Sequence, residues 1–272
     1  MKKNISYRSS ELLRSLNERD QSFFTLQEAM TIMPSREPDA VRRLLADMTK
    51  RGLILRIKDG LYNVIPYEKN SEVYFPNWHL AAEAMIKPRD YYIGFYSALD
   101  IHGLITQPSL IEQVVTEKQV VPKHKILKNV KFEFITLSSK RFFGYQKTWI
   151  DDFNKIYCSD IEKTIIDCLY KPSSAGGISE IVKALYKIRN EIDQDKILSY
   201  LNVFNVQVVN KRLGFILAHL DEFKLLRKEI RSRLSNSYTL LDPSLPKKGK
   251  HFSEWKIIDN SNIDSAINAI TT

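Results

Sequence analysis

The first fifty residues combine apolar positions at helical spacing with polar residues between them. Apolar side chains three or four positions apart lie on one face of an α-helix and can pack together there. This spacing predicts three successive helices, over residues 6–18, from Thr25 to Pro34, and from Pro38 to Gly52. The pattern is clearest in the third helix, where the apolar positions are Val41, Leu44, Leu45 and Met48.

The helix ends and the segment after them carry specific local signals. Thr25 and Glu28 have the spacing of a capping box, in which each side chain accepts a hydrogen bond from the backbone N–H of the other. The runs "LILRI" and "LYNVI" are strand-like, and "KDG" lies between them. Asp59 and Gly60 favour a hairpin because both residue types accept the positive φ angles of a type I′ turn. Three helices followed by a hairpin is the element order of a winged helix-turn-helix.

The pattern changes at "PYEKNSEVYFPNW", so we place a domain boundary within residues 66–77. The N-terminal domain then covers residues 1–70, and the C-terminal domain covers residues 77–272. By pattern, the C-terminal domain divides into a β-rich part, a helical part and a basic tail region, at residues 90–158, 159–235 and 236–258. We therefore predict an α+β protein with an N-terminal winged helix-turn-helix and a mixed α/β C-terminal domain that is mostly helical at its end.

Composition narrows the class of partner. The chain has 272 residues, a formal net charge of +9 and a pI near 9.3. This excess of positive charge favours a polyanionic partner such as DNA or RNA.

The cysteines, the N-terminus and the apolar windows bear on the cellular compartment. Cys158 and Cys168 have the spacing of neither a metal knuckle nor a disulfide framework, which predicts reduced thiols in a cytoplasmic protein. The basic N-terminus precedes no apolar run, and no window approaches about 18 consecutive apolar residues. The sequence therefore predicts no signal peptide, no membrane span and no membrane partner.

The predicted third helix carries cations on the side opposite its apolar stripe. At 100° per residue this side consists of Asp39, Arg43, Ala46 and Lys50, with Arg42 on its flank. In a helix-turn-helix the equivalent helix lies in the major groove of DNA. Arginine can bind guanine there with two hydrogen bonds, and a small side chain can contact a thymine methyl group. Asp39 has two possible roles, as an acceptor from a cytosine amine or as a stabiliser of the helix N-terminus.

Cations also lie shortly before and shortly after this helix in the sequence. Arg56 and Lys58 alternate with apolar residues on the first hairpin strand, where a wing lies beside DNA phosphates. A winged helix can instead be a protein-interaction module whose charged face is only solvated. The predicted DNA-binding residues are Ser35, Arg36, Asp39, Arg42, Arg43, Ala46, Lys50, Arg56 and Lys58.

A second basic surface is predicted within residues 223–256. This segment holds nine Lys or Arg and three acidic residues, a net charge of +6. It could contact DNA that flanks an operator or an acidic partner surface, or it could be a solvated face with a basic loop. The candidate residues lie on one helical face and on a proline-flanked loop: Arg227, Lys228 and Arg231, and Lys247, Lys248 and Lys250.

No catalytic signature is present in the sequence. The chain lacks a glycine-rich phosphate loop, G-x-S-x-G, H-E-x-x-H and the kinase motifs, and its five histidines have no ligand spacing. Asp100 and His102 suggest a general base, but a role at a helix end is favoured. Glu162 and Asp167 fall on different faces of a helix, where a capping box pairs Ser159 with Glu162. We therefore expect no catalytic residue, no metal site and no cofactor.

Three stretches resemble the AbiEi family of antitoxins and transcriptional regulators. "RGLILRIKDGLYNVIP" is similar to its wing, and "YYIGFYSALDIHGL" to the start of its second domain. "DIEKTIIDCLYKPSSAGGISEIVKAL" resembles its capped helix, proline, Gly-Gly turn and following helix. "LDPSLPKKGKHFSEWKI" also resembles the end of its C-terminal domain. The likeness spans about residues 20–255 and depends on the order of these segments, since none of them is a catalytic signature.

This resemblance implies a cytoplasmic bacterial or archaeal antitoxin of a type IV toxin–antitoxin system linked to abortive phage defence. The winged helix would bind inverted repeats in double-stranded DNA of its own promoter and repress the operon. The C-terminal domain would counteract a cognate nucleotidyltransferase-like toxin, with or without direct contact. One departure is Asp59, which precedes the wing glycine where the family commonly has a basic residue, and this argues against a phosphate contact at the wing tip.

Two other functions are compatible with the residues. The first is a winged-helix transcriptional regulator, unrelated to a toxin, whose β-rich middle part senses a small ligand. The second is a metal-dependent nuclease that a winged helix targets to DNA and that uses Glu162 and Asp167.

Overall fold

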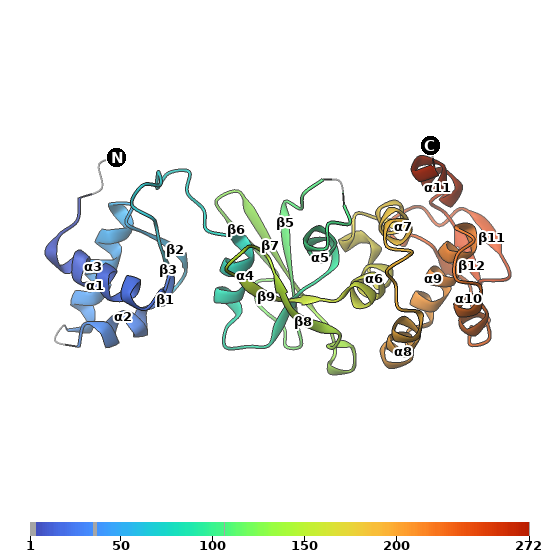
Figure 1. Ribbon diagram of the computed structural model, residues 1–272, viewed down its shortest axis with the longest axis horizontal. Coiled ribbons are helices and arrows are strands. Elements are labelled where there is room, and N and C mark those ends of the chain that lie inside the picture. Colours follow the sequence, from blue (N-terminus) through green and yellow to red (C-terminus); the bar gives the residue numbers. More distant parts are fainter. Residues whose placement is uncertain (1–3, 35–36, 106, 272) are drawn as a thin grey trace. The chain divides into compact units, whose positions relative to one another are not determined.

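The computed structural model describes residues 4–34, 37–105 and 107–271 (Figure 1). Within these residues the chain forms eleven α-helices and three β-sheets, which makes it an α+β protein as predicted. The chain divides into two compact units. The N-terminal unit comprises residues 1–89 and 126–130, and the C-terminal unit comprises residues 90–125 and 131–272.

The N-terminal unit packs three helices beside a small antiparallel sheet whose strand order is β1-β3-β2. Its core contains apolar side chains from all three helices, including Leu12, Ala29 and Leu45. The three helices and the hairpin predicted from periodicity are confirmed. The elements are α1 (Tyr7–Glu18), β1 (Phe23–Thr25), α2 (Leu26–Ile32), α3 (Pro38–Lys50), β2 (Ile54–Lys58), β3 (Leu61–Val64) and α4 (Trp78–Ile86).

Local signals set the ends of these helices. The Thr25 hydroxyl accepts from the Glu28 N–H at 3.2 Å, and the Glu28 carboxylate accepts from the Thr25 N–H at 2.6 Å, so the capping box is confirmed. Pro38 is the first residue of α3, where its missing N–H costs no hydrogen bond. Gly52 follows the end of α3 with a φ of +69°, a conformation that glycine adopts without steric cost.

The hairpin forms where it was predicted, but its turn is of another type. A type I′ turn needs positive φ at two central residues, and only Gly60 has positive φ in this turn. Arg56 pairs with Tyr62 and Lys58 pairs with Leu61, so the register shifts between them. The prediction of a type I′ turn is therefore wrong, because a bulge in β2 takes up the extra residue.

The boundary between the units lies later in the chain than the predicted 66–77 segment. Helix α4 lies in the range assigned to the C-terminal domain from the sequence, but it belongs to the N-terminal unit. The Lys58 ammonium donates to the Met85 carbonyl in α4 at 2.6 Å. The Lys128 ammonium holds the 66–77 segment by donating to three carbonyl oxygens, those of Ser71, Glu72 and Tyr74. These contacts join residues far apart in the chain, so composition alone placed the boundary too early.

The first part of the C-terminal unit is built on a six-stranded mixed sheet with the order β6-β7-β5-β4-β9-β8. Strands β5 and β7 are parallel, as are β4 and β9, whereas β8 and β9 form an antiparallel hairpin. The elements are β4 (Tyr91–Ile93), α5 (Phe95–Ile101), β5 (Ile111–Thr116), β6 (His124–Leu127), β7 (Val130–Thr136), the 3-10 helix η1 (Ser139–Arg141), β8 (Tyr145–Trp149) and β9 (Lys155–Ser159).

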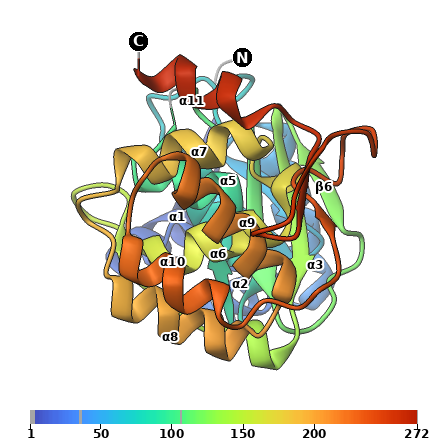
Figure 2. The same ribbon diagram turned by 90° about the vertical axis from the view of Figure 1, so that its right-hand side faces the viewer.

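The remaining residues form a helical layer and a three-stranded sheet. Figure 2 shows α6 and α9 in the middle of this layer, with α7 and α11 on one side and α8 and α10 on the other. Trp255 is buried against Gly214 of α9, so this tryptophan is a packing residue. The elements are α6 (Ile161–Tyr170), η2 (Pro172–Ser174), α7 (Ile178–Lys187), α8 (Gln194–Phe204), α9 (Gln207–His219), α10 (Lys224–Arg231), β10 (Thr239–Leu240), β11 (Lys250–Phe252), β12 (Ile257–Asp259) and α11 (Ile263–Thr271).

Candidate nucleic-acid interface

Helix α3 presents a cationic face to solvent. Its apolar stripe is buried in the N-terminal unit, with Val41, Leu45 and Met48 at 2% exposure or less. The opposite side is exposed and carries Asp39, Arg43, Ala46 and Lys50, with Arg42 on its flank. We call Arg42, Arg43, Ala46 and Lys50 the α3 face. The buried side and the exposed side of α3 are therefore the ones that its sequence spacing predicts.

The cations of the α3 face differ in their partners. Arg42 donates to the Asp39 carboxylate at 2.7 Å, and both side chains are more than half exposed. An exposed ion pair of this kind contributes only about 0–1 kcal/mol, so a phosphate or a base can replace Asp39 at small cost. Arg43 and Lys50 form no ion pair with any residue that the structure describes. Asp39 lies in the first turn of α3, and its hydrogen-bond partner is Arg42.

The hairpin cations are more constrained than the sequence indicated. Arg56 pairs with Asp59 at 2.5 Å, and both side chains are exposed. The Lys58 ammonium donates a hydrogen bond to the Met85 carbonyl. Burial, together with the nearby positive charge of Arg89, lowers the pKa of Lys58. Both side chains are exposed, but the Lys58 ammonium is bound to a backbone carbonyl, whereas Arg56 is held only by an exposed ion pair that a phosphate can replace.

One further cation of this region, Arg51, is bound inside the N-terminal unit. Arg51 directly follows α3, but its guanidinium donates to the Asn4 carbonyl at 2.9 Å and to the Ser9 hydroxyl at 2.8 Å, and it pairs with Asp47. It therefore joins α1 to α3 instead of adding charge to the surface. Sequence reasoning missed this role because the α1 partners are more than forty residues away. The predicted DNA contacts Ser35 and Arg36 lie outside the described residues.

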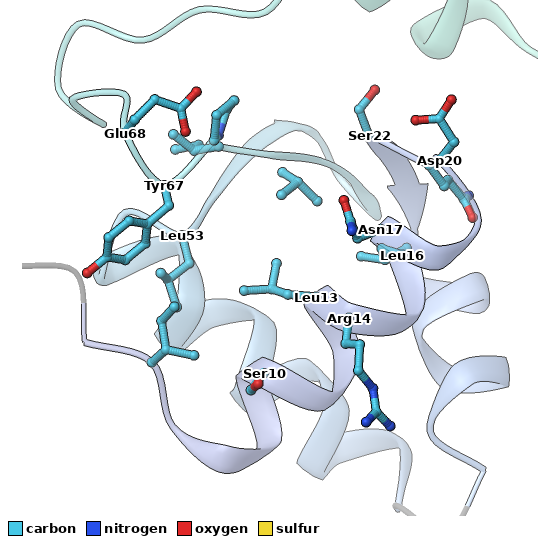
Figure 3. A pocket seen from close by; sticks show the side chains of 15 residues that line it. Ser10, Leu13, Arg14, Leu16, Asn17, Asp20, Ser22, Leu53, Tyr67 and Glu68 are labelled. Atoms are coloured by element: carbon cyan, nitrogen blue, oxygen red, sulfur yellow. The ribbon is translucent and has the colours of Figure 1, made fainter.

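The N-terminal unit also has an open groove of about 570 Å³ beside α1, with Leu13 and Leu16 on its floor. Figure 3 shows Asp20 and Glu68 at its rim, while the side chain of Arg14 points away from both carboxylates. Arg14 is paired with Glu18 at 3.7 Å. Because carboxylates repel a polyanion, this groove is poorly suited to DNA, and the α3 face remains the cationic candidate of this unit.

On helix α10 the second basic surface carries less unpaired positive charge than the sequence predicted. Arg227 is 17% exposed and pairs with Asp221, and Arg231 pairs with Glu254 at 2.6 Å. Lys228 is exposed and has no ion pair among the described residues. The three candidates on α10 are therefore not equivalent, since acidic neighbours neutralise two of them.

The loop side of this surface keeps its charge. Lys247 and Lys248 are exposed in the connection before β11. Lys250 was expected on the same loop, but it is the first residue of β11, and its ammonium lies 5.0 Å from the centre of the Phe252 ring. Its pairing with Asp259 in β12 places Lys250 in the strand and not in the loop.

Asp100 and His102 have separate partners in the structure. The His102 ring nitrogen Nε2 lies 2.7 Å from the Ser159 carbonyl and 3.9 Å from the Cys158 sulfur. The Asp100 carboxylate accepts from the backbone N–H of Ser109 at 3.0 Å. Burial raises the pKa of the Cys158 thiol, which disfavours the thiolate form that a nucleophile requires.

The two carboxylates of the nuclease hypothesis are also separately engaged. Glu162 pairs with Lys196 at 2.7 Å, and its other oxygen accepts from the Asp193 N–H. The capping box of Ser159 with Glu162 is wrong, because the N-cap of α6 is Asp160, which accepts from the Lys163 N–H at 2.9 Å. Within the described ranges, no three His, Cys, Asp or Glu residues are grouped so that they could hold a metal ion.

Asp167 belongs to a buried ionic network in the C-terminal unit. Its carboxylate bonds to the Lys163 ammonium and accepts from the Tyr92 hydroxyl at 2.9 Å, and all three side chains are fully buried. The Lys163 ammonium also donates to the Tyr92 hydroxyl at 2.8 Å. Burial lowers the pKa of Lys163 and raises that of Asp167, and the attraction between the two opposes both shifts. This network joins β4 to α6.

Comparisons with known proteins bear on the fold alone. No family model matches the chain, and no curated protein matches it. A solved structure with a similar fold is the crystal structure of the RV2827C protein from Mycobacterium tuberculosis. The two are 12% identical in sequence, with a TM-score of 0.74 over 99% of this chain and 97% of that chain. In the part of the chain that the structure describes, none of the helices is long and apolar enough to cross a membrane.

Proposed function

We propose that the N-terminal unit is a winged helix-turn-helix that binds double-stranded DNA through α3. The observation that carries this proposal is the α3 face, on which Arg43 and Lys50 are exposed beside Ala46 without an acidic partner among the described residues. The succession of α1, α2, α3 and the β2–β3 hairpin supports it. In this arrangement α2 crosses the DNA backbone and α3, the second helix of the motif, lies in the major groove.

Each residue of the α3 face has a role that its chemistry suits. Arg43 binds the edge of a guanine, since a guanidinium offers two parallel donors to its O6 and N7. Ala46, one turn further on, contacts a thymine methyl group, and Lys50 at the end of α3 contacts a phosphate. Arg42 leaves Asp39 for a phosphate or a base, because their ion pair is exposed. Arg56 contacts the backbone from the hairpin.

We further propose that the protein is an antitoxin that represses its own operon. DNA binding to inverted repeats in its promoter is the repressor half. The antitoxin half, in which the C-terminal unit counteracts a nucleotidyltransferase-like toxin, rests on the resemblance to the AbiEi family. In this role the protein needs no catalysis and no cofactor. The exposed lysines of the second basic surface, Lys228, Lys247, Lys248 and Lys250, are available to an acidic partner or to flanking DNA.

Replacing Arg43 by alanine is expected to weaken binding to the upstream promoter DNA by about 1–3 kcal/mol and to relax base preference at one position. Arg42→Ala is expected to weaken it too, and Lys50→Ala to lower the salt dependence by about one counterion. The measurement is a titration of the full chain with the upstream DNA and with scrambled DNA at two salt concentrations.

Lys69→Ala is the matched control, because it removes one exposed positive charge from the same unit outside α3 and the hairpin. Lys128 is unsuitable as a control, since its ammonium holds three backbone carbonyls. Equal affinities for Arg43→Ala and Lys69→Ala, or equal binding to scrambled DNA, would contradict a recognition role for α3.

The antitoxin half is tested by co-expression with the neighbouring gene. We expect the full chain to restore growth and a fragment of residues 1–89 to bind promoter DNA without restoring growth. The fragment ends at residue 89 because a shorter one, ending at residue 75, would lose the Met85 carbonyl that holds Lys58. Rescue by the fragment alone would show that the C-terminal unit is not the antitoxin part.

A further inference from the structure

A pocket of about 580 Å³ opens in the β-rich part of the C-terminal unit, a volume within the range that small ligands occupy. One wall is apolar and comes from β7, the segment after it and the end of α6, with Phe134, Leu137 and Tyr170. The polar residues of the pocket include Lys123, Glu133, Thr136 and Lys171. We call it the β7 pocket. It is separate from the α3 face and from the second basic surface.

The polar side of the β7 pocket is held by a buried amide. Glu133 pairs with Lys171 at 3.5 Å, and its second oxygen accepts from the Gln113 side chain at 3.0 Å. Gln113 is 4% exposed and also donates to the Ser174 carbonyl. Its oxygen accepts from the Tyr96 N–H at 2.8 Å. The position of Glu133 is therefore set by hydrogen bonds through Gln113, and Glu133 in turn holds Lys171 by an ion pair.

The same chain supports a strained residue in the pocket wall. Phe95 lines the pocket, is fully buried and has a φ of +54°. A bulky residue in this conformation is strained, and such residues persist where the surrounding structure holds them, often at ligand sites. The hydrogen bond from the Tyr96 N–H to Gln113 fixes the backbone directly after Phe95. The strained backbone of Phe95 therefore lies next to the residue that Gln113 holds by a hydrogen bond.

The unused charge in the β7 pocket is positive. Glu133 is already satisfied by Lys171 and Gln113. Lys123 is exposed and forms no ion pair with a described residue, and its backbone carbonyl is anchored on β7 by the Phe134 N–H at 2.8 Å. His124 lies beside it in the lining. A ligand that complements this pocket has an apolar body and a negative group.

We propose that the β7 pocket binds a small organic anion. Its apolar body packs against Phe134, Leu137 and Tyr170, and its carboxylate or phosphate is held by Lys123 and Lys171. A carboxylic acid and a phosphate monoester share this chemistry, and the experiment separates them. The proposal concerns a site that the DNA-binding role does not use, so either can fail without the other.

Isothermal titration of the full chain with four matched probes tests the charge requirement. We expect phenylacetate or phenyl phosphate to bind at least about tenfold more tightly than phenylacetamide and phenethylamine, because only the anions form charged hydrogen bonds with the lysines. The stronger of the two anions identifies the ligand class. Equal binding of anion and amide, or no binding of either anion, would overturn the proposal.

Three variants locate the site. Lys171→Gln and Lys123→Gln are each expected to weaken anion binding about tenfold. Thr136→Trp, at an exposed position of the lining, is expected to abolish it by filling the pocket. Lys147→Gln is the control, since this lysine is exposed like Lys123 but lies outside the lining. Amide spectra confirm that each variant is folded. Unchanged binding in Thr136→Trp, or equal losses in Lys147→Gln and Lys171→Gln, would place the anion elsewhere.

Discussion

Lys163→Ala is expected to lower the free energy of unfolding of the C-terminal unit by about 3–5 kcal/mol, the range for breaking one side of a buried ion pair. The Lys163 ammonium is fully buried among its bonds to Asp167 and Tyr92 and the rings of Phe143 and Phe204. Without it, the Asp167 carboxylate stays buried with the Tyr92 hydroxyl as its remaining donor. The desolvation of that carboxylate is then no longer offset by a cation.

The variant pair distinguishes a lost cation from lost packing. Lys163→Met combined with Asp167→Leu removes both charges and keeps similar volumes, and such replacements are often neutral or stabilising. We expect the double variant to be more stable than Lys163→Ala. Denaturant-dependent hydrogen exchange of the α6 amides measures the C-terminal unit separately from the rest.

Lys183→Ala is the matched control for Lys163→Ala. Lys183 pairs with Glu180 at 2.7 Å on α7, but both side chains are partly exposed. A pair of this kind contributes about 0–1 kcal/mol. Equal losses for Lys163→Ala and Lys183→Ala would mean that the buried network is not a special source of stability.

Gly214→Ala is expected to lower the free energy of unfolding by about 2 kcal/mol, although alanine is the better helix former. Helix propensity alone favours alanine over glycine by about 1 kcal/mol. Opposing this, a Cβ at Gly214 would lie 2.0 Å from a ring carbon of Trp255. Trp255 is 4% exposed, so the ring has no free space to enter, and overpacking of a core costs about 1–3 kcal/mol or more.

The sign of the effect should reverse when the ring is absent. In a Trp255→Leu background, Gly214→Ala has no ring to meet, and the helix preference of alanine remains. We therefore expect Gly214→Ala to be neutral or stabilising there, a coupling that a double-mutant cycle measures directly. A stabilising Gly214→Ala in the natural background would mean that α9 and Trp255 are not in tight contact.

The parts that sequence reasoning predicted correctly depend on near neighbours. The capping box joins Thr25 to Glu28, three residues apart, and the stripe of α3 spans two turns. Helical geometry converts such spacings directly into a buried side and an exposed side, so the composition of the α3 face was accessible as well. The turn between β2 and β3 was placed correctly but assigned the wrong type, because the bulge depends on pairing across the hairpin.

The sequence by itself therefore determined the order of helices and strands, the buried stripe of α3 and the cations on its opposite side, since each follows from residues within a few turns of one another. Tertiary structure alone decided which cations are bound by partners within the protein. Arg51 donates a hydrogen bond to Ser9, and Lys58 donates one to the Met85 carbonyl. Lys163 donates one to Tyr92, a residue 71 positions away. Burial and hydrogen-bond partners at such separations arise only when distant segments pack together, and periodicity carries no signal of them.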